Sequence, residues 1–291
     1  MERFADLLIA AVLLAGLYAT MAYGLGLIYG VLRIVNLNHG GMIMAGAYAG
    51  WYLHHALGVD PYISLLPVAA VSFGVGILIY RLLVRRPPRR AAGGVQSLLL
   101  LFGVWLMVRN AAYLMFTGND QTLRTSYATR ALAVGSALIS VNRIAVFGVA
   151  VGILIALHLL LTRTYVGKAI RAVAQNADSC TLVGIPVERI YALTFGLGTA
   201  LAAVAGLLGA SLFPFNPSFG ASELLKSFVV VVLGGLGSVA GTAVAALILA
   251  LVEVFAILVI PAYLTAAVGF VLLVLVLVVR PGGLFGQRVL G

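Results

Sequence analysis

Long apolar runs separated by short polar stretches dominate the sequence. We identify nine such runs, at Leu7–Gly30, Gly40–Leu57, Tyr62–Val84, Val95–Phe116, Ile144–Leu161, Ile190–Leu212, Leu224–Gly235, Val239–Ile260 and Tyr263–Val279. An α-helix of ~20 residues crosses the ~30 Å hydrocarbon core of a membrane, so most of these runs are long enough to span it. The run Leu224–Gly235 is too short to cross alone, which predicts a broken or re-entrant element.

No run shows the alternation of period two that a membrane β-strand requires. The sequence therefore predicts an all-α polytopic membrane protein, with about eight or nine transmembrane or broken helices in a single domain over residues 1–291. The composition agrees, because 63% of the residues are hydrophobic and only 9% are charged, whereas a soluble domain has roughly 25% charged residues. The 34 glycines favour closely packed membrane helices.

The positions of the charges predict the topology. The net charge is +10, but the charges lie in short loops between apolar runs, so we expect no nucleic-acid partner. Lys and Arg concentrate at residues 81–90, 163–189 and 280–288, and the positive-inside rule places all three regions in the cytoplasm. With nine crossings, the N-terminus is then outside and the C-terminus inside.

Two glycine-rich breaks, Asn36–Gly46 and Leu233–Gly241, each lead into a long apolar helix. Paired interrupted helices often mark the translocation path of a transporter; the alternative is two tight helix contacts made by small residues. Asn38 has two open interpretations, capping the following helix or lining the path. His39 can titrate near neutral pH, but a single His is more often a hydrogen-bonded structural group than a proton carrier.

The longest polar segment, Thr162–Arg189, predicts an amphipathic helix. Its small apolar face comprises four residues spaced three or four apart: Ile170, Val173, Ala174 and Ala177. We expect this face to dock in a groove of another protein, because a helix lying on lipid usually carries larger apolar residues. Gly184 is expected to end the helix in a left-handed conformation, and Pro186 prevents its continuation.

Two ionisable residues, Glu253 and Arg109, fall inside apolar runs. Charges within a membrane are functional candidates by default, although these two could also pair with each other. The outer loop Phe213–Gly220, followed by Glu223 and Lys226, is either a rigid turn or a docking surface at the outer mouth.

Enzyme chemistry has no signature in the sequence. We find no phosphate-binding loop of the type G-x-x-x-x-G-K-[ST], no nucleophile triad, no pair of catalytic carboxylates and no His or Cys at metal-ligand spacing. We therefore expect no enzyme activity and no cofactor in this chain. If transport is driven by ATP, the ATP and Mg²⁺ belong to a separate ATPase chain.

Over almost its full length the chain resembles the permease subunit of bacterial ABC importers of the branched-chain amino acid type, the first of the two paired permeases. The resemblance is carried by Gly26–Gly30, Ile34–Gly40, Gly167–Ala174, Leu182–Ile185, Phe215–Pro217, Val232–Ser238 and Arg280–Gly286. It implies a multi-pass protein of the inner membrane that works with a second permease, expected as a heterodimer, with two nucleotide-binding ATPases and with a periplasmic substrate-binding protein.

The resemblance also implies roles for individual residues. The loop at about 163–189 is similar to the cytoplasmic coupling loop that seats in the ATPase, with core positions Ala174, Asn176, Asp178, Gly184 and Ile185. The two breaks are similar to pathway segments, and with Glu253 they give the path candidates Asn36, Asn38, His39, Gly40, Gly234, Gly235, Gly237 and Glu253. The outer loop gives the candidates for docking the binding protein: Asn216, Pro217 and Glu223.

One departure from the family pattern concerns Gly41, where many members carry Glu. It bears on specificity, because relatives also carry urea, amides or small organic acids, and the binding protein sets much of the selectivity. A proton-coupled secondary transporter using Glu253 or His39 is a rival interpretation, but it has no need of a groove-docking helix. A channel is disfavoured because no ring-forming motif is present.

Overall fold

The computed structural model describes residues 2–85, 93–123, 125, 127, 130–134, 137–261, 264–280 and 282–285. The predicted basic residues at 86, 89, 90, 124 and 288 lie outside this part of the chain. The described helices are α1 (Glu2–Leu32), α2 (Asn38–Leu57), α3 (Pro61–Ile79) with the π-helical turn η1 (Tyr80–Val84), α4 (Gly93–Phe116), α5 (Val141–Arg163), α6 (Tyr165–Gln175), α7 (Ala177–Leu182), α8 (Val187–Leu212), α9 (Phe219–Gly234), α10 (Val239–Ala256) and α11 (Thr265–Val279).

Each of the nine predicted apolar runs contains a helix, so the all-α membrane fold is confirmed. Six helices are long and apolar enough to cross a membrane: α1, α3 with η1, α4, α5, α8 and α10. The helix α9, with 16 residues, is only about 24 Å long at 1.5 Å per residue. It therefore does not cross a bilayer alone, as its short apolar run indicates.

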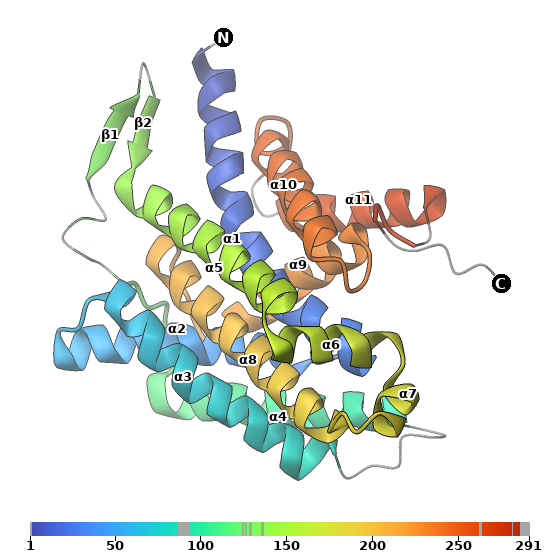
Figure 1. Cartoon of the computed structure of the whole chain (residues 1–291). Coiled ribbons are helices and arrows are strands. Elements are labelled where there is room, and N and C mark those ends of the chain that lie inside the picture. The colour runs from blue at the N-terminus through green and yellow to red at the C-terminus, as the bar shows by residue number, and fades with distance from the viewer. Residues whose placement is uncertain are drawn as a thin grey trace.

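A small β-hairpin before α5 has no counterpart in the sequence prediction. Strands β1 (Ala131–Val134) and β2 (Ala137–Ser140) pair antiparallel, with Ala131 opposite Ser140. Four-residue strands are too short for a period of two to stand out from the surrounding polar loop. The hairpin lies beside the N-terminal half of α1, at the end of the bundle opposite α6 and α7 (Figure 1).

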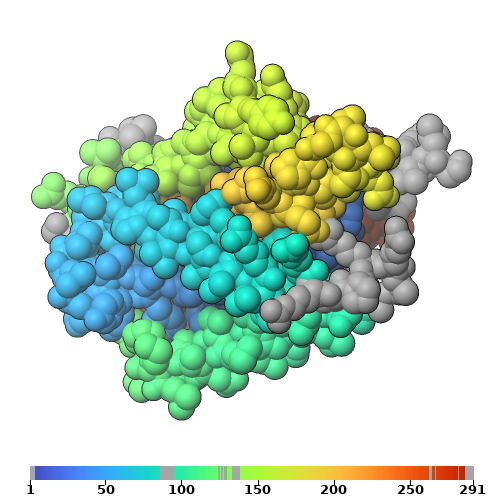
Figure 2. All heavy atoms as spheres, turned by 60° about the horizontal axis from the view of Figure 1, so that its bottom comes forward, coloured from blue at the N-terminus to red at the C-terminus, as the bar shows by residue number. Residues whose placement is uncertain are grey.

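Helices α1 and α8 form the centre of the bundle. α8 packs against α1, α2 and α3, while α1 also packs against α5, α9 and α10. Figure 2 shows the face on which α3 lies between α4 and α5. These outer helices expose large apolar side chains such as Leu66, Leu114 and Ile155, as expected of surfaces that contact lipid or another membrane subunit.

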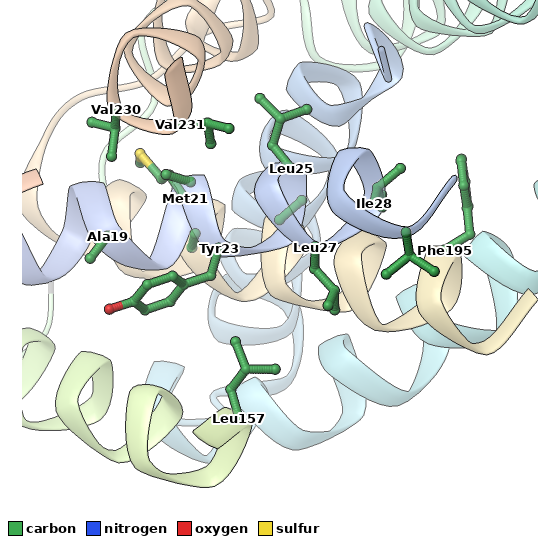
Figure 3. Close-up of a cluster of buried hydrophobic side chains, with 14 of the residues drawn as sticks. Ala19, Met21, Tyr23, Leu25, Leu27, Ile28, Leu157, Phe195, Val230 and Val231 are labelled. Atoms are coloured by element: carbon green, nitrogen blue, oxygen red, sulfur yellow. The ribbon is translucent and has the colours of Figure 1, made fainter. Parts of the chain in front are cut away.

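The core around α1 consists of interdigitated apolar side chains. Met21 and Leu25 of α1 lie near Val230 of α9, while Phe195 of α8 and Leu157 of α5 close the cluster from the other side (Figure 3). Lipid is as apolar as these side chains, so the helices are held together by close van der Waals packing rather than by expulsion of water.

Glycines bring the backbones of α2 and α8 into direct contact. A Cβ on Gly46 would overlap the carbonyl group of Ala203, and a Cβ on Gly206 would overlap that of Ile43. Only glycine permits this approach. The contact fixes α2 against the most buried helix of the protein.

The first break places the start of α2 inside the bundle. Residues 33–37 are not helical, and Arg33 has a φ of 56°. At the start of α2, the Nε2 atom of His39 lies 2.7 Å from the carbonyl oxygen of Met21. Met21 is about 16 Å along α1 from its end at Leu32. The non-helical segment therefore climbs beside α1, and α2 begins well inside the protein.

The helix α9 also begins inside the bundle, next to the start of α2. A Cβ on Gly220 would overlap the carbonyl of Gly40, and a Cβ on Gly40 would overlap that of Gly220. The N-terminal turns of two helices thus meet backbone to backbone. We call this meeting point, Asn36–Gly41 together with Ser218–Gly220, the helix junction.

The second break, Gly235–Ser238, has a different position from the first. Gly235 and Gly237 have φ values of 94° and 90°. The break packs against Gly30 near the end of α1 and against the C-terminal segment, where the Leu284 amide donates to the carbonyl of Leu233 over 2.8 Å. The second break therefore makes a tight contact of small residues, which is one of the two alternatives given by the sequence. The pathway role of Gly234, Gly235 and Gly237 stays a prediction.

The glycine contact between α2 and α8 can be tested with single methyl groups. We expect Gly206→Ala to destabilise the protein by roughly 1–3 kcal/mol, because the added methyl forces the two backbones apart. Gly152→Ala in α5 is the matched control, since a Cβ there has no atom within 4 Å. Thermal unfolding in detergent measures the difference. An equal melting temperature for the two variants would contradict the packing described.

Candidate functional site

The helix junction holds buried polar side chains that lack partners. Asn36, Asn38 and His39 are each at most 1% exposed. The amide groups of both asparagines and the Nδ1 atom of His39 have no hydrogen-bond partner in the described structure. Unpaired polar groups in a protein interior are costly, so the junction is suited to binding a polar group that arrives from elsewhere.

The junction bears on the interpretations of Asn38 and His39, and their pathway role stays a prediction. The residue at the N-cap of α2 is Leu37, and no side chain caps the helix, so capping by Asn38 is not observed. His39 is a hydrogen-bonded structural group, since its Nε2 atom contacts the Met21 carbonyl. Gly41 lies close to the Asn38 side chain, since a Cβ there would be 2.6 Å from its Oδ1 atom, and a larger residue would require that side chain to move.

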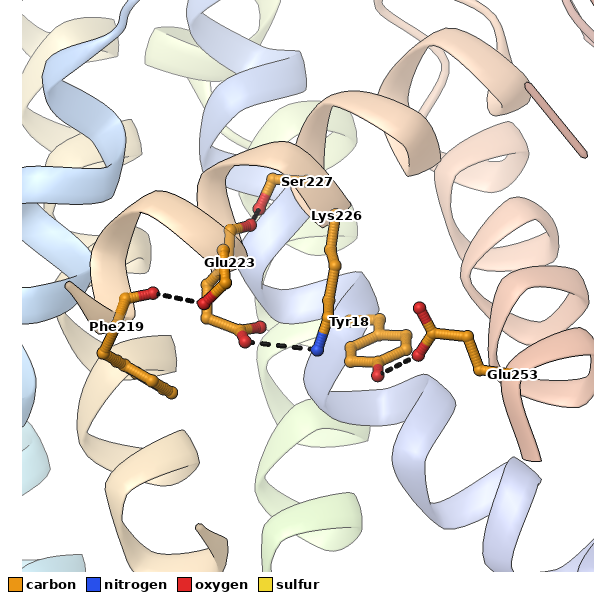
Figure 4. A network of polar contacts seen from close by, with 7 residues as sticks. Tyr18, Phe219, Glu223, Lys226, Ser227 and Glu253 are labelled. Atoms are coloured by element: carbon orange, nitrogen blue, oxygen red, sulfur yellow. Dashed lines mark hydrogen bonds and ion pairs between the residues drawn. The ribbon is translucent and has the colours of Figure 1, made fainter. Parts of the chain in front are cut away.

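A second polar cluster links α1, α9 and α10. The Tyr18 hydroxyl donates to the Oε2 atom of Glu253, which is 8% exposed. The Lys226 ammonium lies 3.2 Å from the Oε1 atom of Glu223 and 5.0 Å from the centre of the Tyr18 ring. Figure 4 shows Lys226 between Glu223 and the Tyr18 ring, with Glu253 on the far side of that ring. The cluster ties three helices together.

The suggested pair between Glu253 and Arg109 does not form. Glu253 is on α10 and bonds Tyr18, whereas the Arg109 guanidinium on α4 donates to the Ser218 hydroxyl at 3.3 Å. Sequence gave no signal for the Tyr18 contact, because 235 residues separate the two partners. The Glu223–Lys226 pair was not predicted, although opposite charges three residues apart are a signal for such a pair once the segment is known to be a helix.

The outer loop is a braced turn. The Nδ2 atom of Asn216 donates to Asp120 at 2.8 Å, and its Oδ1 atom accepts from the Ser218 amide. A backbone bridge between Gln121 and Phe215 completes the brace. Pro217 is buried, and Glu223 is 6% exposed and paired with Lys226. Glu223 is therefore not available as a docking contact in this structure, whereas Asn216 is half-buried at the loop surface.

The predicted coupling loop forms two helices instead of one. Asn176 interrupts the helix and caps α7 by accepting from the Ser179 amide at 2.9 Å. The expectation that the apolar face of this loop docks on another protein is wrong, because Ile170 and Val173 are buried in the chain's own core. An α6 this short is stabilised mainly by such packing.

The surface available for docking is α7 and the turn after it. Leu182 is 88% and Val183 is 75% exposed. Gly184 has a φ of 80°, which confirms the predicted left-handed end. Among the other predicted coupling positions, Asn176 and Asp178 are exposed, while Ala174 and Ile185 are half-buried.

A cavity of about 750 Å³ lies between α7, the start of α8 and η1. In its wall, Glu188 accepts from the Tyr80 hydroxyl at 2.9 Å and lies 3.4 Å from the Nε atom of Arg85. These contacts join the start of α8, which follows α7, to the π-helical turn at the end of α3.

Comparisons with known proteins agree with this architecture. The family model described as "Branched-chain amino acid transport system / permease component" matches residues 7–279. The permease BraD of the high-affinity branched-chain amino acid transport system of Pseudomonas aeruginosa is 32% identical over 283 residues, covering 93% of this chain and 92% of BraD. LivH of Escherichia coli K12, from a system of the same description, is 32% identical over 95% of this chain and 93% of LivH.

The fold has a counterpart of known structure. One chain of "PsaBC from Streptococcus pneumoniae in complex with Fab" superposes with a TM-score of 0.52 over 96% of this chain and 94% of that chain, at 14% identity. At this identity the likeness concerns the fold alone.

The contact between Tyr18 and Glu253 predicts a measurable coupling. Tyr18→Phe leaves the buried carboxylate without its donor, at a cost on the order of 1–3 kcal/mol. We expect a clear fall in the melting temperature, and a smaller fall for Glu253→Gln, which keeps an acceptor for the tyrosine. A third single variant, Glu253→Leu, removes the acceptor. In Tyr18→Phe/Glu253→Leu both polar partners are absent, so its loss should be less than the sum of the losses of Tyr18→Phe and Glu253→Leu. If the losses of stability in this double-mutant cycle are strictly additive, the contact between Tyr18 and Glu253 contributes nothing to the free energy of unfolding.

Proposed function

The chain belongs to the family of permease components of branched-chain amino acid transport systems, and from this premise we propose that it forms the translocation path for branched-chain or other hydrophobic amino acids in an ATP-driven importer. The observation that carries the proposal is the match to BraD and LivH over more than nine-tenths of every chain compared. A match of that extent includes the helix junction and the α6–α7 segment alike.

The helix junction is the proposed path segment. It supplies unpaired amide and imidazole groups in the interior of a bundle whose outer surface is apolar. Transporters commonly bind polar substrates where discontinuous helices begin near the middle of the membrane. An amino acid in transit carries charged and polar groups, and the junction offers them partners that lipid does not.

The surface around Leu182 and Val183 is the proposed seat for an ATPase. Two exposed apolar side chains beside a left-handed glycine form a compact knob at one end of the bundle. ATP-driven closure of two ATPases would pull on α7, and the contacts of Glu188 with Tyr80 and Arg85 would pass the movement to α3. Hydrolysis of ATP takes place in these partner chains.

The proposed topology has α6 and α7 in the cytoplasm of a bacterium and the N-terminus outside the inner membrane. Arg85 and Arg189 line the same cavity as α7, in support of a single cytoplasmic face. A second permease completes the path, and a periplasmic binding protein delivers the substrate at the opposite end.

The rival secondary transporter has less support. Glu253 accepts from the Tyr18 hydroxyl and the Nε2 atom of His39 contacts a backbone carbonyl, so each side chain already makes a contact within the fold. Substrates such as urea, amides or small organic acids stay possible within the importer proposal, because the binding protein selects much of what reaches the permease.

The experiment that tests the proposal is purification of the tagged chain from native membranes in mild detergent, with mass spectrometry of its companions. Recovery of a second permease and of P-loop ATPases supports the importer. Recovery of this chain alone, from membranes in which other transporter complexes survive the same detergent, would overturn it.

The exposed knob on α7 gives a specific prediction. Leu182→Asp should reduce recovery of the ATPases at least tenfold, because a charge then enters an apolar contact, while the melting temperature stays within a few degrees. Leu138→Asp in the hairpin is the matched control, since Leu138 is 78% exposed at the opposite end of the bundle. Equal ATPase recovery with both variants would show that α7 is not the seat.

A further inference from the structure

Arg109 is a cation within the membrane-crossing part of α4. It precedes the end of the helix at Phe116 by seven residues, or about 10 Å. Charged residues at such depth are expensive unless they pair or face water, and they usually mark a functional site. Glu253 and Lys226 have partners of their own, as described above, whereas Arg109 has no acidic partner among the described residues.

Among the described residues, Arg109 contacts neutral groups. Its Nη2 atom donates to the Ser218 hydroxyl at 3.3 Å, and its guanidinium carbon lies 5.9 Å from the Trp105 ring centre and 5.5 Å from that of Tyr113. Among the described residues no carboxylate lies within ion-pair distance of it. Asp120 instead accepts from Asn216, and Glu223 pairs with Lys226.

One donor of the guanidinium is free although it is covered. The Nε atom of Arg109 is buried and has no hydrogen-bond partner in the described structure. A guanidinium is a fork of donors that fits a carboxylate with two parallel hydrogen bonds. The buried Nε atom without an acceptor therefore leaves part of this fork able to bind an anionic group.

The surroundings of Arg109 add to its preference for an anion. Ser218 is at the N-terminus of α9, where no side chain caps the helix and the helix dipole is positive. Tyr113 shares a 2.8 Å hydrogen bond with the same Ser218 hydroxyl. The site also adjoins the helix junction, because a Cβ on Gly41 would lie 3.2 Å from the Cδ1 atom of Trp105.

The direction of the Arg109 side chain argues against a lipid headgroup as the anion. An arginine that reaches for the membrane surface leaves its charged head exposed to water. Here Nε is covered, and Nη2 is turned toward Ser218 on a neighbouring segment of the chain. The guanidinium therefore points toward the start of α9, where Ser218 lies.

We propose that Arg109, with Ser218 and Tyr113, binds the α-carboxylate of the amino acid as it enters the path from the outer side and passes to the helix junction. This inference rests on the proposed function and names the group of the substrate that the permease itself recognises. Every α-amino acid carries this carboxylate, so the site accepts the substrate class and leaves the choice of side chain to the binding protein.

The test uses the complete importer in proteoliposomes, with the binding protein and labelled leucine outside and ATP inside. Cys180 is the single native cysteine, so Arg109→Cys is made on a Cys180→Ala background. We expect uptake to fall at least tenfold. An ammonium-bearing methanethiosulfonate should restore part of it, and a sulfonate-bearing one should not. Loaded binding protein with ATP should slow the modification several-fold. Leu114→Cys, at an outward position of the same helix that is 87% exposed, should show neither effect.

Several results would overturn the inference. They are a cysteine at 109 that water-soluble reagents do not reach, equal outcomes with reagents of both charges, or a modification rate that substrate does not change. If the cysteine at 109 is modified slowly in the assembled complex both with and without substrate, the anion that binds Arg109 belongs to a partner subunit and not to the substrate. If the cysteine variant does not assemble, Arg109→Lys and Arg109→Gln in the native chain provide the test instead. Arg109→Lys should raise the KM for loaded binding protein a few-fold, and Arg109→Gln should abolish uptake. Failure of the complex with the native chain to import any amino acid would refute the proposed function; normal import by the native chain with no effect of the substitutions at Arg109 refutes this inference alone.

Discussion

The structure depends on helices that touch through their backbones. Gly46 and Gly206 let α2 and α8 meet without intervening side chains, and Gly40 and Gly220 do the same for the first turns of α2 and α9. Inside a membrane no expulsion of water drives helices together, so contact area at short range has to supply the attraction. These glycines also decide where α2 and α9 begin. Both start inside the bundle, and the polar residues of the junction are carried there with them.

Buried polar groups in this protein form clusters that differ in whether their hydrogen bonds are satisfied. Tyr18 and Glu253, with Lys226 and Glu223 beside them, satisfy one another and tie α1, α9 and α10 together. Asn36, Asn38 and Arg109 retain unpaired polar atoms. A satisfied cluster stabilises a fold, whereas an unsatisfied one costs stability and is retained where a ligand completes it. The second kind lies where two helices begin.

The sequence predicts the helices well and the contacts between them poorly. Hydropathy located every membrane helix, because the bilayer leaves the backbone few alternatives to an α-helix. The coupling segment shows the limit: its small apolar face suggested a groove in another protein, but Ile170 and Val173 fill a space in the chain's own core. The spacing of apolar residues identifies the apolar face of a helix, but it does not say which surface that face packs against. Likewise Glu253 could be recognised as unusual, while its partner Tyr18 could not, since no rule of spacing links residues so far apart. The exposed Leu182 and Val183 became visible as a surface only when the turn at Gly184 was in place.

The measurement that tests the account most directly is uptake of labelled leucine into proteoliposomes that contain this permease with its copurifying subunits. The account predicts accumulation that requires ATP inside and binding protein outside, and that does not respond to an imposed pH gradient. Accumulation driven by a pH gradient, with this chain alone in the membrane and no ATPase present, would contradict it.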